Sequence, residues 1–389
     1  MDNSSYVTYL VMDGHIELHK YRYFYFIITL TVYLLIICCN VVVIFVIYTN
    51  KCLHEPMYIF IAALLFNSLF GTTAFYPKLL SDFLSERQVT SYSACLFQAF
   101  FIYTYAASEF ALLTAMAYDR YVSICKPLQY ATLIKISTVK KLLLCCCFFP
   151  ACEIGTLIIL TSRLQLCKFH LDRIYCNDYS IAKLSCGDTS VTNLYGLFCV
   201  TLTVFPALIF IIYSYVRIFE ICLKNSKEFR RKALQTCFPH LFILISFCVF
   251  SCIEVITPRL EGNIPHTISE IMPILGLVFP PLINPIMYGL KLQEIDSKIK
   301  KIMFNAGMKV PVLLPFSSQL VGWTSVVQLE SLFNELFQRV WCVTSGQLIF
   351  DPAAEALLEG VAQAKAQPIS SEMTYATSEH SVGSLEGCC

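Results

Sequence analysis

The chain has 389 residues, of which 57% are hydrophobic and only 14% are charged, and its mean hydropathy is +0.64. A soluble protein usually carries about 25% charged residues, so the composition excludes an ordinary soluble fold and favours a protein that crosses a membrane several times. The formal net charge of +1 provides no strongly basic surface, and we therefore predict no nucleic-acid partner.

Seven apolar runs are long enough to cross a bilayer, because a membrane-spanning helix needs about 20 residues. In chain order these runs span residues 24–49, 57–80, 95–118, 142–160, 194–216, 233–253 and 271–290. The sequence predicts an all-α integral membrane protein: a seven-transmembrane helix bundle over residues 24–290.

The distribution of Lys and Arg predicts the orientation of the bundle. The loops that the pattern assigns to one side hold about twice as many Lys and Arg as the loops on the other side; the basic loops are 49–55, 120–141, 217–232 and 291–309. These loops should be cytoplasmic, which places residues 1–23 outside as an extracellular N-terminus and leaves the C-terminus in the cytoplasm. Asn3 begins an Asn-Ser-Ser sequon and would be glycosylated on the outer side.

Cysteine usage agrees with this topology. Of the 20 cysteines, those in outer loops or at outer helix ends are Cys95, Cys167, Cys176 and Cys186. Four oxidisable cysteines allow three pairings, and their positions alone do not choose among them. The remaining cysteines lie in helices or on the reducing side, where thiols stay free.

Two further segments follow the seventh run. Residues 291–306 combine apolar residues at helical spacing with several lysines, which predicts an amphipathic cytoplasmic helix on the lipid of the inner leaflet; a solvated basic tail is the alternative. Residues 307–389 differ in composition from the rest of the chain, and we expect an atypical, disordered cytoplasmic tail with one helical pattern over 326–341.

Ionisable residues at membrane depth are functional candidates, since a charge at the centre of a spanning helix costs about 2.5–3.5 kcal/mol on insertion scales. The candidates are Lys78, Glu109, Glu153 and His240. Lys78 is near the end of its run and can extend to the interface. Glu153 has no partner that the sequence identifies, and His240 lacks a second histidine at metal-binding spacing, which favours a structural role.

Glu109 lies deep in the third run and needs a partner. Asn40, Asn67, Ser68 and Asn284 could supply polar neighbours from the first, second and seventh runs. We predict a polar cluster in the middle of the bundle that holds water or Na⁺, in preference to a catalytic acid.

Asp119 and Arg120 end the third run, and a neighbouring acid and base can serve acid–base chemistry, a surface ion pair or a switch. The sequence contains no HExxH, GxSxG or phosphate-binding glycine loop, so we predict that the protein is not an enzyme. Because the topology places the pair at the cytoplasmic mouth of the bundle, the switch is favoured. Pro285 follows Asn284 and predicts a hinge or a static kink in the seventh helix.

Several motifs resemble the rhodopsin-like G-protein-coupled receptors and, within them, the olfactory (odorant) receptors. They are "HEPMYIFIAALL", "MAYDRYVSIC", "SYVRI", "KALQTCFPHL", "PPLINPIMYGLK" and the three cysteines of the loop before the fifth run. They occur in the family's order across about residues 20–305. The stretch "FNSLFGTTAFYPKLL" is similar to the fish-type odorant receptors.

The resemblance implies two disulfides, Cys95–Cys176 and Cys167–Cys186. It implies no cofactor and no metal site beyond a weak sodium site near Glu109. The chain departs from the family at the usual second-helix Asp, where Asn67 and Ser68 stand, and this puts a strong sodium site in doubt.

The resemblance also implies a multi-pass plasma-membrane receptor for a small-molecule odorant. The ligand would bind among the outer halves of the third, fifth and sixth helices, lined by Ile102, Tyr103, Ala106, Cys199, Thr203, Ser251, Cys252 and Val255. Activation would free Arg120 from Asp119 and open a site for a stimulatory, olfactory-type heterotrimeric G protein, which raises cAMP. The remaining switch residues would be Tyr215, Asn284, Pro285 and Tyr288.

The rival class is a transporter or channel, which would need a polar path or repeated halves, and the sequence shows neither. A membrane-embedded enzyme is a more distant third.

Overall fold

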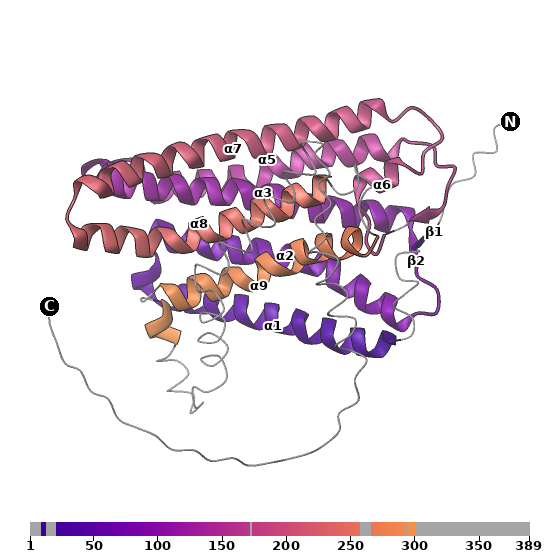
Figure 1. Ribbon diagram of the computed structural model, residues 1–389, viewed down its shortest axis with the longest axis horizontal. Coiled ribbons are helices and arrows are strands. Elements are labelled where there is room, and N and C mark those ends of the chain that lie inside the picture. The colour runs from indigo at the N-terminus through magenta and orange to yellow at the C-terminus, as the bar shows by residue number, and fades with distance from the viewer. Residues whose placement is uncertain (1–8, 13–20, 172, 257–265, 293–294, 300–389) are drawn as a thin grey trace, which may run out of the picture. The chain divides into compact units, whose positions relative to one another are not determined.

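The computed structural model describes residues 9–12, 21–171, 173–256, 266–292 and 295–299. Asn3 and the tail from residue 307 onward lie outside the described residues. The long helices of the described chain are α1 (Arg22–Thr49), α2 (Pro56–Leu84), α3 (Tyr92–Cys125), α5 (Ile136–Ser162), α7 (Ser190–Lys224), α8 (Lys227–Ile256) and α9 (His266–Lys291). Figure 1 shows them side by side.

Each predicted apolar run falls inside one of these helices, which confirms the helical membrane-protein class. Six of them have both the length and the apolarity to cross a membrane, and the described apolar part of α9 is shorter, at Ile274–Gly289. The helices extend beyond the predicted runs because helical hydrogen bonding continues through the polar turns at their ends. Beyond α9, residues 295–299 are helical, so the predicted segment 291–306 is described only in part.

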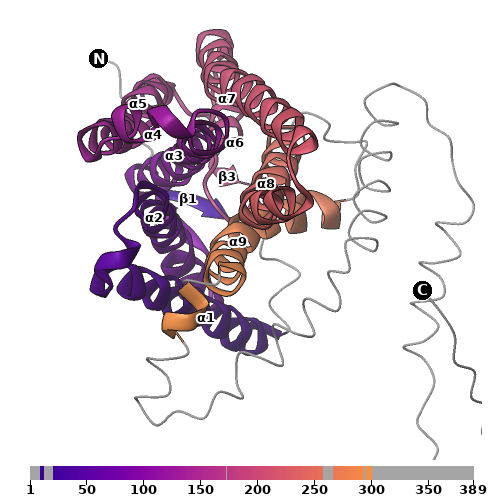
Figure 2. The same ribbon diagram turned by 90° about the vertical axis from the view of Figure 1, so that its left-hand side faces the viewer.

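The helix α3 forms the centre of the bundle. In its most apolar window 67% of the residues are buried, compared with 17% in α7. Figure 2, which views the bundle along the helices, shows α2, α5, α7 and α8 around α3. Large apolar side chains cover the outer surface, and Ile27, Phe45 and Ile209 are more than half exposed. Exposed apolar surface of this extent is typical of contact with lipid.

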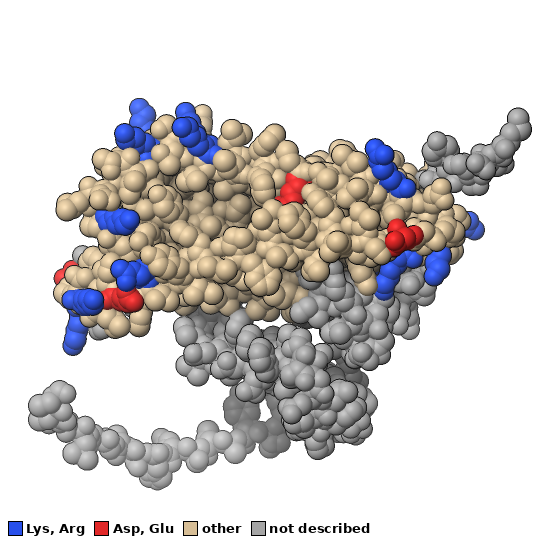
Figure 3. Space-filling view, turned by 90° about the horizontal axis from the view of Figure 1, so that it is seen from above, with Lys and Arg blue, Asp and Glu red and all other residues tan. Residues whose placement is uncertain are grey.

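Charged side chains gather near the two ends of the bundle, and the broad band between them in Figure 3 is almost entirely free of them. This pattern matches a bilayer-spanning band, because the hydrocarbon core excludes charge.

The sequence explains where two of the helices begin and how closely they pack. Pro56 occupies the first turn of α2, where its missing N–H is not needed. Ser91 caps α3 by accepting a hydrogen bond from the Ala94 backbone N–H at 3.2 Å. Gly71 lets α2 approach α3, since a Cβ at this position would lie 2.4 Å from Cγ of Tyr105.

A small three-stranded sheet lies at one end of the bundle, and the sequence did not predict it. The strand β1 (Tyr9–Met12) lies between β2 (Val89–Ser91), to which it is antiparallel, and β3 (His170–Leu171), to which it is parallel. Leu10 and Met12 alternate along β1 and are buried with the cysteines of the neighbouring disulfide.

We call this end of the bundle the sheet end. Because α3 starts directly after β2 and carries Arg120 near its other terminus, we call the opposite end the Arg120 end. The short elements of the Arg120 end are η2 (Lys51–Leu53), η3 (Pro127–Gln129) and α4 (Tyr130–Leu133), and the sheet end also carries α6 (Asp178–Ala182).

Candidate functional site

Glu109 is fully buried in α3 and accepts two side-chain hydrogen bonds. The Asn67 amide donates to its Oε2 at 2.8 Å, and the Asn284 amide donates to its Oε1 at 2.8 Å. Asn284 also lies 3.3 Å from the Ser68 hydroxyl. The structure therefore brings α2, α3 and α9 together at one carboxylate, as the predicted polar cluster requires.

Asn40 lies in the same region but hydrogen-bonds to a different group. Its amide donates to the carbonyl oxygen of Pro281 at 2.8 Å, and also to Ile36 of its own helix. In an α-helix the carbonyl of residue 281 would accept from the N–H of residue 285, and Pro285 has none. Asn40 thus occupies a hydrogen-bonding position that the proline leaves open.

Asp119 and Arg120 form a contact ion pair at the Arg120 end. Arg120 donates to Asp119 Oδ2 through Nη2 at 2.6 Å and through Nε at 3.2 Å. The other carboxylate oxygen accepts from the Tyr130 hydroxyl at 2.9 Å. Tyr130 starts α4 in the loop after α3, so this loop helps to hold Asp119 in place, which the sequence had not indicated. Burial beside the Asp119 carboxylate raises the pKa of Tyr130 and keeps its hydroxyl protonated as a donor.

His240 links three helices close to this ion pair. Its Nε2 lies 2.9 Å from the carbonyl oxygen of Leu113, and its Nδ1 lies 2.6 Å from the Tyr215 hydroxyl. A carbonyl only accepts, so Nε2 carries the proton and Nδ1 of a neutral ring accepts from Tyr215. The structural role predicted for His240 fits this arrangement.

Tyr288 is 2% exposed, and its hydroxyl has no hydrogen-bond partner among the described residues. It lies within electrostatic reach of Arg120 and of Tyr215. A buried hydroxyl without a partner is costly, so a conformer in which Tyr288 gains one is favoured on that account.

At the sheet end, Cys95 pairs with Cys176 and Cys167 pairs with Cys186, both with Cα atoms 5.3 Å apart. The Gln98 side chain accepts from the backbone N–H of Cys176 at 3.0 Å. The loop between α5 and α7 is therefore fixed to α3 by a covalent bond and by a hydrogen bond three residues further along the helix.

Two side-chain hydrogen bonds hold the same loop against the helices. The Tyr175 hydroxyl donates to Glu254 of α8 at 2.6 Å, and the Thr161 hydroxyl donates to Asp178 at the start of α6. Burial raises the pKa of Asp178 to about 6, an effect that the hydrogen bond from Thr161 only partly opposes.

The predicted ligand-lining residues differ in burial and in the side chains they pack against. Ile102 is buried against Tyr175 of the loop, and Tyr103 packs near the disulfide of Cys95. Ala106 borders the main core. Cys252 is exposed and does not join this group.

On the remaining helices, Cys199 is buried in α7, Thr203 is partly buried one turn further along, and Ser251 of α8 is partly buried. The side chain of Val255 lies outside the described residues.

Glu153 is the residue whose partners the sequence did not reveal. It is 7% exposed in α5, and its Oε2 accepts from the Thr203 hydroxyl of α7 at 3.1 Å. Its carboxyl group also lies beside the Cys199 thiol, and Oε1 accepts no hydrogen bond within the described part of the chain. The signal that could have found this site was in the sequence: a membrane-embedded acid needs a donor, and Thr203 was already a ligand candidate.

The described residues contain no group of His, Cys, Asp and Glu suited to hold a metal ion. A cavity of about 520 Å³ lies between α2 and α3 and shares no residue with the predicted ligand-lining set.

Comparison with known proteins gives consistent matches. The family model for olfactory receptors matches residues 29–306. Olfactory receptor 52K1 of Homo sapiens is 35% identical over 278 residues, which cover 71% of this chain and 88% of that receptor. Olfactory receptor 52J3 of Homo sapiens is 34% identical over 271 residues, covering 69% and 87%. Olfactory receptor 51E1 of Homo sapiens is 30% identical over 309 residues, covering 78% and 96%. These matches do not test the resemblance to the fish-type receptors, which stays a prediction.

Proposed function

Because the chain belongs to the olfactory receptor family and is an odorant-binding G-protein-coupled receptor of the membrane, we propose that an odorant bound near the sheet end frees Arg120 from Asp119. The freed conformer accepts a stimulatory, olfactory-type G protein and raises cAMP. In this proposal the sheet end is extracellular and the Arg120 end is cytoplasmic, with residues 291–306 against the inner leaflet.

The closed Asp119–Arg120–Tyr130 arrangement is the observation that supports the switch. Two charges 4 Å apart attract by roughly 4 kcal/mol at an effective dielectric constant of 20, and desolvation offsets much of this. An ion pair of that net strength can restrain Arg120 at rest and still be broken by a ligand that binds the active conformer better.

In this proposal, activation also changes the hydrogen bonds of one tyrosine on α7 and one on α9. The Tyr215 hydroxyl is bonded to His240, whereas the buried Tyr288 hydroxyl has no partner within the described residues. We propose that Arg120 moves toward these two tyrosines, so the Tyr215–His240 hydrogen bond breaks when the switch opens.

Glu153 suggests the chemistry of the odorant. Its Oε2 accepts from Thr203, its carboxyl group lies beside Cys199, and its buried Oε1 accepts no hydrogen bond within the described residues. An odorant with a hydrogen-bond donor, such as an amine or an alcohol, would pair with this oxygen, while its apolar part would contact Ile102 and Ala106. Ser251 completes the proposed pocket more readily than the exposed Cys252 does.

The ligand part of the proposal is tested with a panel of volatile amines, alcohols, esters and hydrocarbons of matched carbon skeleton, with cAMP as the readout. We expect amines and alcohols to activate the receptor and Glu153→Gln to weaken them about tenfold or more, equivalent to roughly 1.4 kcal/mol. Glu220→Gln is the matched control, because Glu220 is exposed and pairs only with Arg217 among the described residues. An equal response of Glu153→Gln to all four classes would overturn the assignment.

The switch part is tested with Arg120→Ala. We expect normal surface expression and loss of ligand-driven cAMP. Normal signalling by this variant would contradict the proposed role of the ion pair, whatever the odorant is.

A further inference from the structure

Tyr175 and Glu254 join the sheet-end loop to α8, and the proposed switch does not use this contact. The Tyr175 hydroxyl donates to Oε1 of Glu254 at 2.6 Å, and the Tyr175 side chain is 3% exposed. A hydroxyl that donates to a carboxylate at this distance makes one of the stronger hydrogen bonds found in proteins. The contact therefore restrains the end of α8 that lies next to the sheet.

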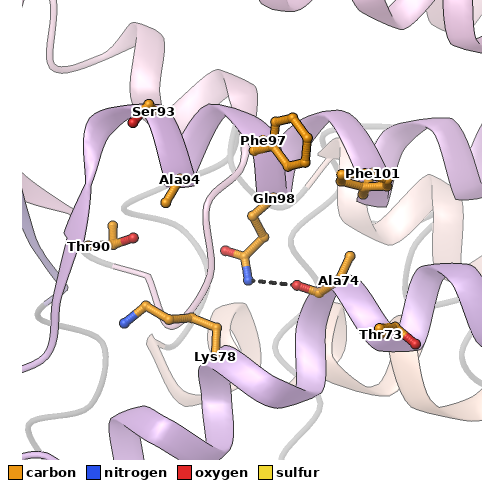
Figure 4. Close-up of a pocket in the computed structure, with 9 residues that line it drawn as sticks. All are labelled: Thr73, Ala74, Lys78, Thr90, Ser93, Ala94, Phe97, Gln98 and Phe101. Atoms are coloured by element: carbon orange, nitrogen blue, oxygen red, sulfur yellow. Dashed lines mark hydrogen bonds between the residues drawn. The ribbon is translucent and has the colours of Figure 1, made fainter.

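The loop side of this contact is fixed to two other helices. The disulfide with Cys95 holds the neighbouring Cys176 on α3. Gln98 accepts from the Cys176 backbone N–H at 3.0 Å and donates to the carbonyl oxygen of Ala74 in α2 at 3.2 Å, the hydrogen bond drawn in Figure 4. Tyr175 is therefore anchored to α2 and α3, and its hydroxyl ties α8 to both.

Three residues on one face of α8 contact α3 or the sheet-end loop. His240, Phe247 and Glu254 follow one another at intervals of seven residues, which is close to two helical turns, so they share a face. The Phe247 ring lies 4.9 Å from the Phe110 ring and 6.3 Å from the Tyr105 ring, both in α3. The Nε2 of His240 lies 2.9 Å from a carbonyl oxygen of α3. This face is thus held by a hydrogen bond at each end and by an apolar contact midway.

The part of α8 between these two hydrogen bonds should move as one body. Its sequence from His240 to Glu254 contains no proline or glycine, so it has no position at which a helix bends sharply. At 1.5 Å per residue it spans about 21 Å, with Phe247 at its midpoint. A tilt about Phe247 that takes His240 away from α3 must also displace Glu254 relative to Tyr175. The two hydrogen bonds are therefore coupled through the helix.

From this arrangement we propose that Tyr175 and Glu254 are positioning residues that set the resting tilt of α8 from the sheet end. The inference deepens the proposed function and rests on it for its consequence, the release of the Tyr215–His240 hydrogen bond. Ile102, a proposed ligand-lining residue, packs in the same apolar cluster as Tyr175. An odorant that displaces the Tyr175 ring therefore weakens a hydrogen bond of the resting state without touching α8 itself.

Cys237 provides a reporter near the other end of α8. Its side chain is 4% exposed and packs in one apolar cluster with Cys222 of α7. It lies about 25 Å along the helix from Glu254, at 1.5 Å per residue. The experiment measures the rate at which a maleimide labels Cys237 in the purified full chain in lipid nanodiscs, localised by mass spectrometry of the peptides. Because the buried thiol reacts only when its surroundings open, the rate reports how often this end of α8 separates from α7. Cys146 of α5, which is 6% exposed, is the reference thiol.

We expect Tyr175→Phe to raise the labelling rate of Cys237 about tenfold, equivalent to roughly 1.4 kcal/mol in the opening equilibrium, and to leave the reference thiol unchanged. Glu254→Gln keeps an acceptor but removes the charge, so it should raise the rate less, and it should add little to Tyr175→Phe in the double variant. Tyr92→Phe is the matched control. Its hydroxyl also bonds at the sheet end, to a backbone carbonyl oxygen of α5 at 3.1 Å, so its loss should not change the rate at Cys237.

An unchanged rate in Tyr175→Phe, or an equal rise in Tyr92→Phe, would overturn the proposed restraint. A joint rise of Cys237 and the reference thiol would also overturn it, because the whole bundle would then have loosened. Phenylalanine keeps the packing of the ring, so folding should be preserved, and Glu254→Gln is a second variant judged by the same outcomes. No odorant, G protein or cAMP enters, so this result is separate from that of Arg120→Ala, which tests the switch itself.

Discussion

Asn40 donates its amide to the carbonyl oxygen of Pro281 across 2.8 Å, joining α1 to α9 at the point where Pro285 interrupts the helical hydrogen bonds. The sequence of α9 allows Pro285 to form either a hinge or a static kink. A kink whose open carbonyl is bonded to another helix is held in place, so in this conformer the proline acts as a fixed bend.

We expect Asn40→Leu to destabilise the receptor by about 1–3 kcal/mol, because it leaves a buried carbonyl without a donor. In the Pro285→Ala background the helix supplies its own N–H at that carbonyl, so the same substitution should cost less. The free energies of unfolding of the four proteins in detergent form a double-mutant cycle that gives the coupling energy. Equal costs in the two backgrounds would show that Asn40 stabilises the bundle in some other way.

Removing the Tyr130 hydroxyl should raise signalling without ligand. Tyr130→Phe deletes the 2.9 Å hydrogen bond to Asp119 and keeps the ring. A hydrogen bond to a charged group contributes about 1.5–3 kcal/mol, so the resting state should lose stability relative to the active one and basal cAMP should increase several-fold. Tyr48→Phe, at a position 79% exposed on α1, is the control. Unchanged basal cAMP in Tyr130→Phe would separate this loop from the switch.

Gly71→Ala should destabilise the protein even though alanine favours helices. The new Cβ would lie 2.4 Å from Cγ of Tyr105, a ring atom near the backbone that cannot move away freely. Overpacking of this kind costs about 1–3 kcal/mol. Gly196→Ala meets its nearest neighbour at 3.7 Å and should be neutral or slightly stabilising. Thermal unfolding in detergent distinguishes the two, and a stable Gly71→Ala variant would contradict the close packing of α2 on α3.

Asp178 should make the packing of the sheet-end loop depend on pH. Burial raises its pKa from 3.8 to about 6, so between these values the folded loop binds more protons than the unfolded chain. Stability therefore falls as pH rises through this window and recovers on acidification, by at most about 3 kcal/mol at 1.36 kcal/mol per pKa unit. Asp178→Asn keeps the acceptor for Thr161 and should raise the melting temperature at pH 7 more than at pH 5.

Asp188, in the same loop, should change the stability with pH in the opposite direction to Asp178. Hydrogen bonds from Ser190 lower its pKa, so its contribution is present at neutral pH and is lost in acid. Asp188→Asn should therefore not increase stability at pH 7. If Asp178→Asn behaved like Asp188→Asn at both pH values, the burial of Asp178 would not control the loop.

The membrane-spanning helices could be predicted from the sequence because each depends on a local property, the length of an apolar run. The fixed spacing of motifs also located Glu109, Asp119 and Arg120 in their helices. Of the polar neighbours expected around Glu109, Asn67 and Asn284 donate hydrogen bonds to its carboxylate, since an acid in the membrane limits the choice to the few amides at a similar depth.

Contacts that depend on how segments fold back could not be predicted in this way. The apolar stretch Tyr9–Met12 is too short to signal a strand by itself, and its pairing depends on two loops that are distant in sequence. Tyr130 reaches Asp119 only because the chain turns through η3. Glu153 and Thr203 are 50 residues apart, and their pairing depends on the rotation of α5 and α7 about their axes, which an almost uniformly apolar helix does not reveal.

The central position of β1 has a practical consequence for experiments on this receptor. One four-residue segment supplies backbone partners to two loops at once, through Val11 N–H to Phe169 and Met12 N–H to Gln88, each at 2.8 Å. Epitope tags and signal sequences fused at the N-terminus are separated by only residues 1–8 from the strand that aligns both loops. A difference in surface expression between two tagged versions of the receptor can therefore originate in this sheet, and variants are best compared with the same N-terminal fusion.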